Sequence, residues 1–353
     1  MSTLTPDLGD RLKHVICRTC KHNNLDDTLA LQRFTVEQIL TGFQRTIKVP
    51  FAVGGGLIHH QMKRETGNAD IRFVRQLEEK EILQSLRDMG GFLASRGIRL
   101  KRVSAAQERQ MHAGTKGMHF KFEAFLGSTR VKSHLDIGFR AGRYSFPEAK
   151  LMKRELPEFF IMQRELGLGF RGWAFPKETQ IAEKLCTSLQ RGAENTRLND
   201  FWDVAFMSGQ GQGIDRELLI HEMTRVIYER QLEYILDDVM VSIPEAMSLD
   251  FIDANAHSWQ IFLTKRRRVQ WTDFDKVMDR VRELYGSIRQ DVVTKVERHM
   301  VETSVLFEEP KIAKGVEVVS RIKGSIAERK AARNLPAGVI DLEEEREARM
   351  GPR

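Results

Sequence analysis

Two aspartates in this sequence have the residue type and the setting that phosphoryl chemistry uses. Asp70 lies in the short apolar run ADIRFV, and Asp136 lies in HLDIGF. A carboxylate within an apolar strand is costly unless it is paired, hydrogen-bonded or bound to a metal. If the two strands are neighbours, both carboxylates can hold one Mg²⁺ whose shell is completed by phosphate oxygens. The structural alternative is that each aspartate caps the end of its strand or pairs with a nearby arginine, Arg72 or Arg140.

A glycine turn stands upstream of the first aspartate. The apolar strand VPFAV runs into Gly54, Gly55 and Gly56, and a helix of LIHHQMKR is expected to follow. Glycine lets backbone N–H groups approach a phosphate, and the start of a helix adds partial positive charge. The arrangement is compatible with a phosphate cradle, but a plain turn between a strand and a helix has the same composition and is the more frequent explanation.

A lysine and a third aspartate follow in the second half of the chain. Lys184 lies among the apolar residues of TQIAEKLCTSLQRG, so its ammonium can face a pocket while its stem is partly buried. Asp200 lies in NTRLNDFWDV, at the expected start of a helix. The structural alternatives are a lysine that snorkels to solvent and an aspartate that caps the helix or occupies its first turn.

The periodicity of apolar residues divides the chain into an α+β half and a helical half. The first half predicts a mixed sheet with flanking helices: helices within residues 1–50 and 76–96, strands in VPFAV, ADIRFV, GIRLKRVS, GMHFKFEAFL and TRVKSHLDIGF, and irregular structure over 144–175. From Thr179 the pattern is helical to about residue 300. We therefore expect an α+β domain over 1–175, a helical domain over 176–306 and a charged, loosely ordered tail over 307–353.

Composition limits the partners and the compartment. The net charge of +7 and the pI of about 9.3 favour polyanionic partners such as RNA and nucleotide phosphates. No apolar run reaches the ~18 residues of a membrane span, so no membrane association is expected. Three cysteines without a disulfide framework predict a reducing cytoplasm. Two of these cysteines lie with two histidines in HVICRTCKH, but their spacing is not that of a recognised zinc finger and favours a helix instead.

The order of these motifs resembles one known family. VGGGL, RETGNAD, FKFEAFLGSTRVKSHLDIGF, ETQIAEKL and NTRLNDFWDV are together similar to the AbiEii/AbiGii nucleotidyltransferase toxins, over roughly residues 30–300. The resemblance implies a polymerase-beta-like nucleotidyltransferase core that transfers a nucleotide from an NTP to an RNA acceptor, with tRNA the first candidate. It also implies Mg²⁺ as cofactor and a cognate antitoxin, encoded nearby, as partner.

The resemblance also assigns roles to individual residues. It implies a turn over the nucleotide phosphates, a pair of metal-ligand aspartates, and a lysine at the triphosphate together with the aspartate of the last motif. These are, in order, Gly55 and Gly56, Asp70 and Asp136, and Lys184 and Asp200, with Arg197 and Asp203 supporting the last helix.

One acidic position departs from the family pattern R-x-T-x-D-x-D. Arg64, Thr66 and Asp70 match it, but Asn68 stands where the first acid belongs. In an alternative register Asp70 is the first acid and Arg72 replaces the second. Losing one charge at metal–ligand distance removes roughly several kcal/mol of attraction. Two functions are thus open: transfer with Asn68 as a weaker metal ligand, or a degenerate nucleotidyltransferase that binds nucleotide or RNA without efficient transfer.

Overall fold

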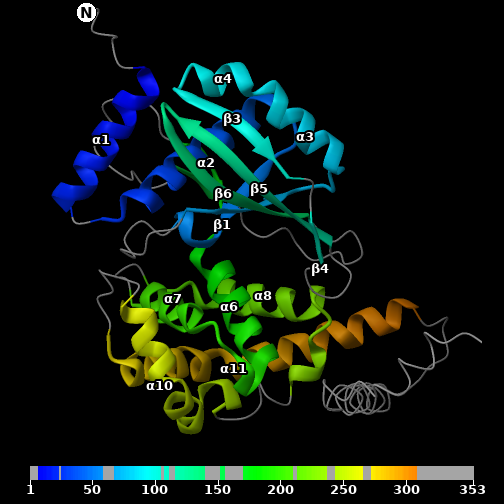
Figure 1. Cartoon of the computed structure of the whole chain (residues 1–353). Helices are drawn as coiled ribbons and strands as arrows, with labels where there is room; N and C mark the ends of the chain where they lie inside the picture. Colours follow the sequence, from blue (N-terminus) through cyan, green and yellow to red (C-terminus); the bar gives the residue numbers. More distant parts are fainter. Residues whose placement is uncertain are drawn as a thin grey trace, which may run out of the picture.

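A computed structural model describes residues 7–23, 25–58, 67–104, 107–110, 116–139, 152–155, 170–209, 213–236, 243–264 and 272–307. Helices and strands follow one another in the first half, and helices alone make up the second (Figure 1). The elements of the first half are α1 (Leu8–Asn23), α2 (Asp27–Thr46), β1 (Phe51–Gly54), η1 (Gly55–Ile58), β2 (Ala69–Phe73), α3 (Glu79–Asp88), α4 (Gly90–Ala94), β3 (Ile98–Val103), β4 (Gln107–Gln110), β5 (Lys116–Leu126), β6 (Thr129–Phe139), β7 (Met152–Glu155) and β8 (Arg171–Ala174). Those of the second half are α6 (Lys177–Arg191), η3 (Gly192–Glu194), α7 (Leu198–Ser208), α8 (Arg216–Glu229), η4 (Glu233–Ile235), η5 (Glu245–Met247), α10 (Leu249–Thr264) and α11 (Phe274–Phe307).

One mixed sheet of eight strands organises the first half. Its order is β3-β5-β6-β2-β1-β8-β7, and β4 pairs with β5 outside this path. β2 runs parallel to β6 and β1 runs parallel to β8, while the remaining pairs are antiparallel. Successive side chains of a strand point to opposite faces of a sheet. The alternation in β5 therefore places Phe120, Phe122 and Ala124 on a single face, where all three are buried.

Helices α1 to α4 cover this apolar face of the sheet. α2 packs against β5 and β6, α1 packs against β5, and α4 packs against β3. Phe43 of α2 meets the rings of Phe51 and Phe73 edge-on, with ring centroids 6.4 and 6.3 Å apart. The opposite face of the sheet is left to polar residues and turns toward the helical half (Figure 1).

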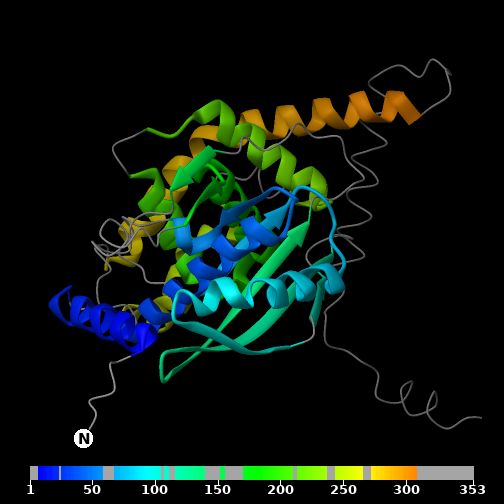
Figure 2. The same cartoon turned by 90° about the horizontal axis from the view of Figure 1, so that it is seen from above.

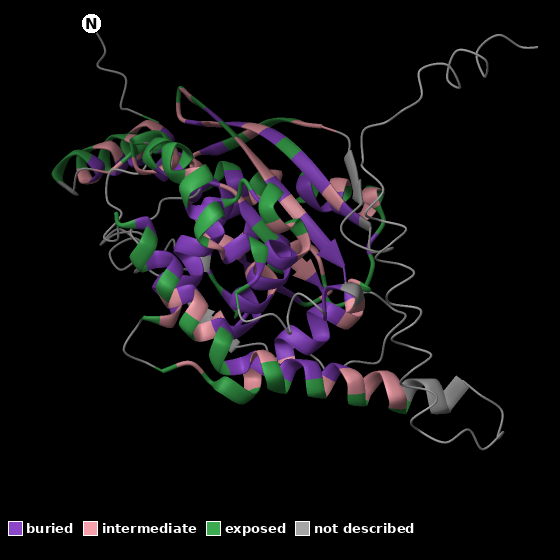
Figure 3. Ribbon diagram, turned by 90° about the horizontal axis from the view of Figure 1, so that it is seen from below, coloured by how far each residue is buried: buried purple, intermediate pink, exposed green. Residues whose placement is uncertain are grey.

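The helical half has a core of its own between α6, α7, α8, α10 and α11. Trp202, Trp259 and Tyr285 are among its largest fully buried side chains. α11 runs along one edge of this half and turns a buried stripe inward (Figure 3). In the view from above, α1 and the end of α11 project on opposite sides of the molecule (Figure 2). No helix within the described residues is both long and apolar enough to cross a membrane.

Two separate apolar cores support the domain limits predicted from the sequence. One core extends from Leu12 to Ala174 and the other from Ile181 to Val296, so the limits at 175/176 fall between them. These limits stay a prediction, and residues 308–353 of the expected tail lie outside the described part of the chain.

Two expectations for local structure are wrong. The helix expected over 76–96 is two helices, α3 and α4, that meet at Met89, where Gly90 and Gly91 follow and weaken a continuous helix. The segment 144–175 contains strands β7 and β8 rather than irregular structure alone. Both strands extend the sheet beyond β1. Each has four residues, which is too few for an alternating pattern of apolar and polar residues to be recognised in the sequence.

Candidate active site

A row of residues crosses four strands on the polar face of the sheet. Gly54 of β1 lies opposite Asp70 of β2, Asp70 lies opposite Asp136 of β6, and Asp136 lies opposite His119 of β5. The flanking residues of β2 and β6 point the other way and are buried in the core. The two aspartates predicted from the sequence are therefore direct neighbours, although 66 residues of chain separate them.

The glycine turn lies against the first aspartate. Gly55 has φ +64°, a conformation that L side chains rarely adopt. A Cβ atom at this position would lie 1.9 Å from Oδ2 of Asp70. Only glycine therefore lets the backbone of η1 approach the carboxylate this closely, and Gly56 continues the same turn.

Asp70 has a carboxylate that the described residues leave without a hydrogen bond or an ion pair. The residue is exposed, yet the surrounding protein desolvates the carboxylate and raises its pKa. The negative charge of Asp136 raises this pKa further, while the ammonium of Lys184 opposes the rise. Because both groups act on Asp70, the sheet and the helical half bring these three side chains into one neighbourhood.

Asp136 is held by two histidines. Nδ1 of His119 lies 2.7 Å from Oδ1 of Asp136, and Nε2 of His134 lies 3.4 Å from Oδ2. Burial disfavours the charged form of Asp136, but the hydrogen bonds from His134 and His119 outweigh it and leave its pKa below the usual value. The two aspartates thus differ: Asp136 is firmly ionised, and Asp70 is the weaker acid.

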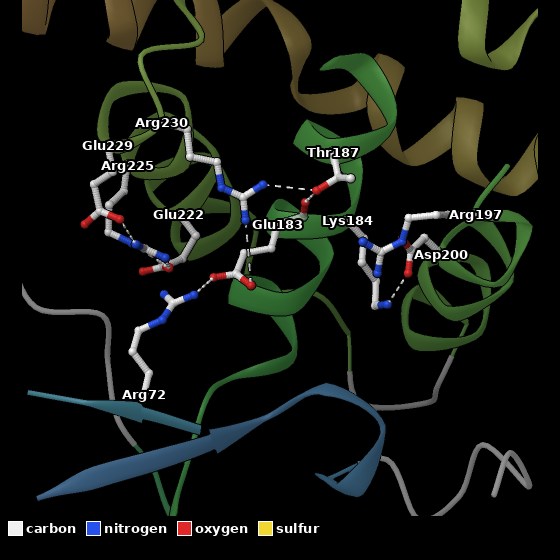
Figure 4. A network of polar contacts seen from close by, with 10 residues as sticks. All are labelled: Arg72, Glu183, Lys184, Thr187, Arg197, Asp200, Glu222, Arg225, Glu229 and Arg230. Atoms are coloured by element: carbon white, nitrogen blue, oxygen red, sulfur yellow. Dashed lines mark hydrogen bonds and ion pairs between the residues drawn. The ribbon is translucent and has the colours of Figure 1, made fainter. Parts of the chain in front are cut away.

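Lys184 of α6 is anchored by two carboxylates of α7. Its Nζ lies 2.5 Å from Oδ1 of Asp200 and 2.8 Å from Oδ2 of Asp203. Arg197 binds the second oxygen of Asp200, with Nε at 2.7 Å from Oδ2 (Figure 4). Asp200 and Asp203 are both 1% exposed. Their carboxylates are therefore shielded from solvent and interact with Lys184. Asp200, predicted as a catalytic residue, lies where it positions the lysine.

Arg72 lies on the same face of β2 as Asp70 and binds Glu183 of α6. Its Nη2 lies 2.6 Å from Oε1 of Glu183, and its guanidinium stacks over the ring of Phe175 at 5.2 Å. Arg230 approaches the other oxygen of Glu183 at 3.9 Å. Although Glu183 is desolvated, Arg72, Arg230 and Arg225 together lower its pKa to about 2 (Figure 4). Arg72 follows Asp70 by two residues on β2, and its positive charge is neutralised by Glu183.

Comparison with known proteins agrees with this geometry. Residues 39–296 match the family described as "Nucleotidyl transferase AbiEii toxin, Type IV TA system". This match spans well over half of the chain. The chain belongs to the AbiEii family. AbiEii proteins are nucleotidyltransferase toxins of toxin–antitoxin systems, so the family implies a nucleotide substrate and an antitoxin partner.

Two crystal structures from Helicobacter pylori are similar to this AbiEii chain at low identity. JHP933 has 12% identity and a TM-score of 0.44, over 80% of this chain and 100% of its own. A protein assigned as a candidate nucleotidyltransferase also has 12% identity and a TM-score of 0.44, over 78% of this chain and 99% of its own. No curated protein matches the sequence significantly.

The structure brings together most of the residues that the AbiEii resemblance assigned. Asn68 directly precedes β2 and is half-buried, and the alternation along the strand places it on the face of Asp70. Arg64, Thr66 and Arg140 lie outside the described residues. The cysteines of HVICRTCKH lie on α1, where Cys20 is buried. The one group of possible metal ligands found among the described residues is His119, His134 and Asp136.

Three features of this AbiEii site were missed in the sequence. His119 becomes a neighbour of Asp136 only through the pairing of β5 with β6, although the spacing of His134, two residues before Asp136, already places it on the same face. Asp203 was assigned to support of the helix, yet it contacts Lys184 directly. The spacing of Asp200 and Asp203, three residues apart on one helix, was the available signal.

Proposed function

We propose that this AbiEii chain transfers a nucleotide from an NTP to an RNA acceptor, with tRNA the first candidate and Mg²⁺ as cofactor. One observation carries the proposal: Asp70 and Asp136 face each other in register on parallel strands, beside a glycine turn and within electrostatic reach of Lys184. Paired carboxylates with a lysine and a backbone turn are the set that nucleotidyl transfer needs.

The donor set fits Mg²⁺. Mg²⁺ prefers oxygen ligands and is commonly bound by one or two carboxylates together with substrate phosphates. Asp70 offers a carboxylate without a described partner, Asp136 is ionised across from it, and Asn68 offers an amide oxygen from the same face. When bound, the ion would polarise the α-phosphate and activate the attacking hydroxyl.

The remaining residues orient the substrates and move the proton. The backbone of the Gly55–Gly56 turn receives the phosphates, because no side chain obstructs it. Lys184, fixed by Asp200 and Asp203, neutralises the leaving pyrophosphate. Asp70, whose carboxylate lies against the Gly55 turn, accepts the proton of the acceptor hydroxyl.

The RNA acceptor is supported by charge and by the family. A net charge of +7 favours a polyanionic partner, because phosphate neutralisation supplies most of non-specific nucleic-acid affinity. The basic run KRRR at 265–268, which we expect to hold the RNA backbone, lies outside the described residues. We expect the protein to act in the cytoplasm, beside its antitoxin.

A second candidate function is nucleotide or RNA binding without efficient transfer. The observation that favours it is Asn68, which stands where the family has an acid. The binding function and the enzyme predict different results for Asn68→Asp. If the native chain is a degenerate binder, Asn68→Asp gains Mg²⁺-dependent transfer that the native protein lacks. If it is an enzyme, the native protein is active and Asn68→Asp changes its rate by a limited factor.

The test is incorporation of labelled NTPs into a total tRNA preparation. We expect incorporation by the native protein and none above background by Asp136→Ala. Binding of NTP measured by calorimetry on the same preparations separates lost binding from lost transfer. Equal incorporation by the native protein and by Asp136→Ala would overturn the proposal that this chain is a nucleotidyltransferase.

A further inference from the structure

Two histidines stand at the metal-ligand aspartate, where carboxylates alone are sufficient for Mg²⁺. His119 and His134 come from neighbouring strands, and their rings lie 4.8 Å apart between centroids. Both lie on the polar face: His119 is in the row that contains Asp70 and Asp136, and His134 precedes Asp136 by two residues on β6. Neither residue is needed for the Mg²⁺ shell described above, so their joint presence calls for a separate explanation.

We propose that His119, His134 and Asp136 form a mixed nitrogen–oxygen centre that binds a divalent transition ion of the Mn²⁺ to Zn²⁺ series. The inference rests on the proposed function, because it places this ion in the same site. Imidazole suits Fe²⁺, Ni²⁺, Cu²⁺ and Zn²⁺. Mn²⁺ shares with Mg²⁺ a preference for carboxylate, carbonyl and water ligands, but as a transition ion it accepts an imidazole nitrogen more readily than Mg²⁺ does. The histidines thereby add nitrogen ligands to a site in which Asn68 stands where the family has an acidic residue.

The distances between the ligand atoms suit one ion. Nδ1 of His119 and Nε2 of His134 lie 2.7 and 3.4 Å from the two oxygens of Asp136, and one ligand atom from each residue can be chosen so that all lie within 4.8 Å of one another. Metal–ligand bonds of about 2.1 Å place neighbouring ligands of an octahedron about 3 Å apart and opposite ligands about 4.2 Å apart. The cluster thus needs only small shifts to close around an ion.

The sheet around this cluster fixes the ring of His119 and supplies a possible fourth ligand, Asp70. His119 is 4% exposed, so its ring is fixed within the sheet, whereas His134 is 38% exposed and is open to solvent on one side. Asp70 lies opposite Asp136 with a carboxylate that no described residue binds. A buried histidine, a partly exposed histidine and the carboxylate of Asp70 together leave room for substrate oxygens at the remaining positions.

The alternative is that the histidines only donate hydrogen bonds that orient Asp136. Residues that hydrogen-bond to a metal ligand also affect metal affinity, by about 10–100-fold, but they do so for every ion that Asp136 binds. A direct nitrogen ligand instead changes affinity selectively, because the loss falls on ions that favour imidazole. Selectivity between Mn²⁺ and Mg²⁺ therefore separates the two roles.

The experiment measures binding of Mn²⁺ by electron paramagnetic resonance to the full chain, freed of metal by chelation and without nucleotide. Pulsed spectra of the native protein should show modulation from imidazole ¹⁴N. His134→Ala should weaken Mn²⁺ binding at least tenfold and reduce the ¹⁴N modulation, while Mg²⁺ affinity, measured by competition, changes less than threefold. His119→Gln keeps a polar side chain of similar size at the buried position and should give the same pattern.

His257→Ala is the matched control, because His257 is an exposed histidine of α10 in the other half of the molecule. It should leave both affinities unchanged. Mn²⁺ binding without ¹⁴N modulation, or an equal loss of Mn²⁺ and Mg²⁺ affinity in the histidine variants, would overturn the proposal. The measurement uses no NTP and no RNA, so an absence of nucleotide transfer would leave its outcome intact and refute only the proposed function.

Discussion

The ion pair between Arg72 and Glu183 joins the strand of Asp70 to the helix of Lys184. Glu183 directly precedes Lys184, and Arg72 follows Asp70 by two residues on the same face. We predict that Glu183→Gln lowers the free energy of unfolding. A pKa lowered from 4.5 to about 2 corresponds to about 3 kcal/mol at neutral pH. The side chain is 28% exposed, and solvent screening reduces the expected loss to about 2–3 kcal/mol.

The pH dependence of this loss is part of the prediction. The folded-state pKa of Glu183 lies below its unfolded-state value, so its contribution is complete above about pH 5 and disappears as the pH falls toward 2. Glutamine does not titrate. The difference between native protein and variant should therefore be constant between pH 6 and 8 and fall to less than half near pH 3.

The assay is urea unfolding followed by circular dichroism across this pH range. The matched control is Asp291→Asn, which removes an ion pair with Arg216 whose side chains are 51% and 54% exposed. An exposed pair contributes about 0–1 kcal/mol, so this variant should stay close to the native protein. A loss below about 0.5 kcal/mol for Glu183→Gln at pH 7, or a loss that does not shrink in acid, would refute the reasoning.

Two further predictions concern the residues of the sheet. Gly55→Ala places a Cβ atom 1.9 Å from Oδ2 of Asp70 in a left-handed backbone conformation, so it should lower both stability and NTP affinity. Gly213→Ala, at a position with open space around it, is its control in thermal unfolding and calorimetry. Asp70→Asn should raise stability at neutral pH while it abolishes transfer, because the raised pKa of Asp70 means that its charge destabilises the folded state. This gain should fade as the pH drops toward 3.8, and an Asp70→Asn variant that is less stable than the native protein at pH 7 would contradict it.

Alternation along strands made much of the site predictable. Asp70 and Asp136 each interrupt an apolar run, and a carboxylate there has few explanations besides pairing or metal binding. The roles expected for the glycine turn and for Lys184 came from the order of motifs, whereas the anchoring of Lys184 by Asp200 and Asp203 did not. The two aspartates and the glycine turn lie side by side in the sheet, and Lys184 reaches them from helix α6.

Contacts between distant segments were beyond the reach of the sequence. Arg72 was expected beside its own strand's aspartate, but its partner Glu183 lies 111 residues later, on a helix whose approach to the sheet no local pattern specifies. The histidine pair required the register of β5 against β6. Strands β7 and β8 are too short for a period of two to stand out from an irregular segment rich in proline and glycine.

The central claim is that nucleotidyl transfer occurs at the paired aspartates, and labelled ATP, GTP, CTP and UTP test it most directly. Each NTP is supplied with ³²P at either the α- or the γ-position, together with tRNA and Mg²⁺. The account predicts that the native protein transfers α-label and no γ-label to RNA, and that the shape-matched variant Asp136→Asn transfers neither. Transfer of γ-label, or α-label transfer that Asp136→Asn retains, would contradict it.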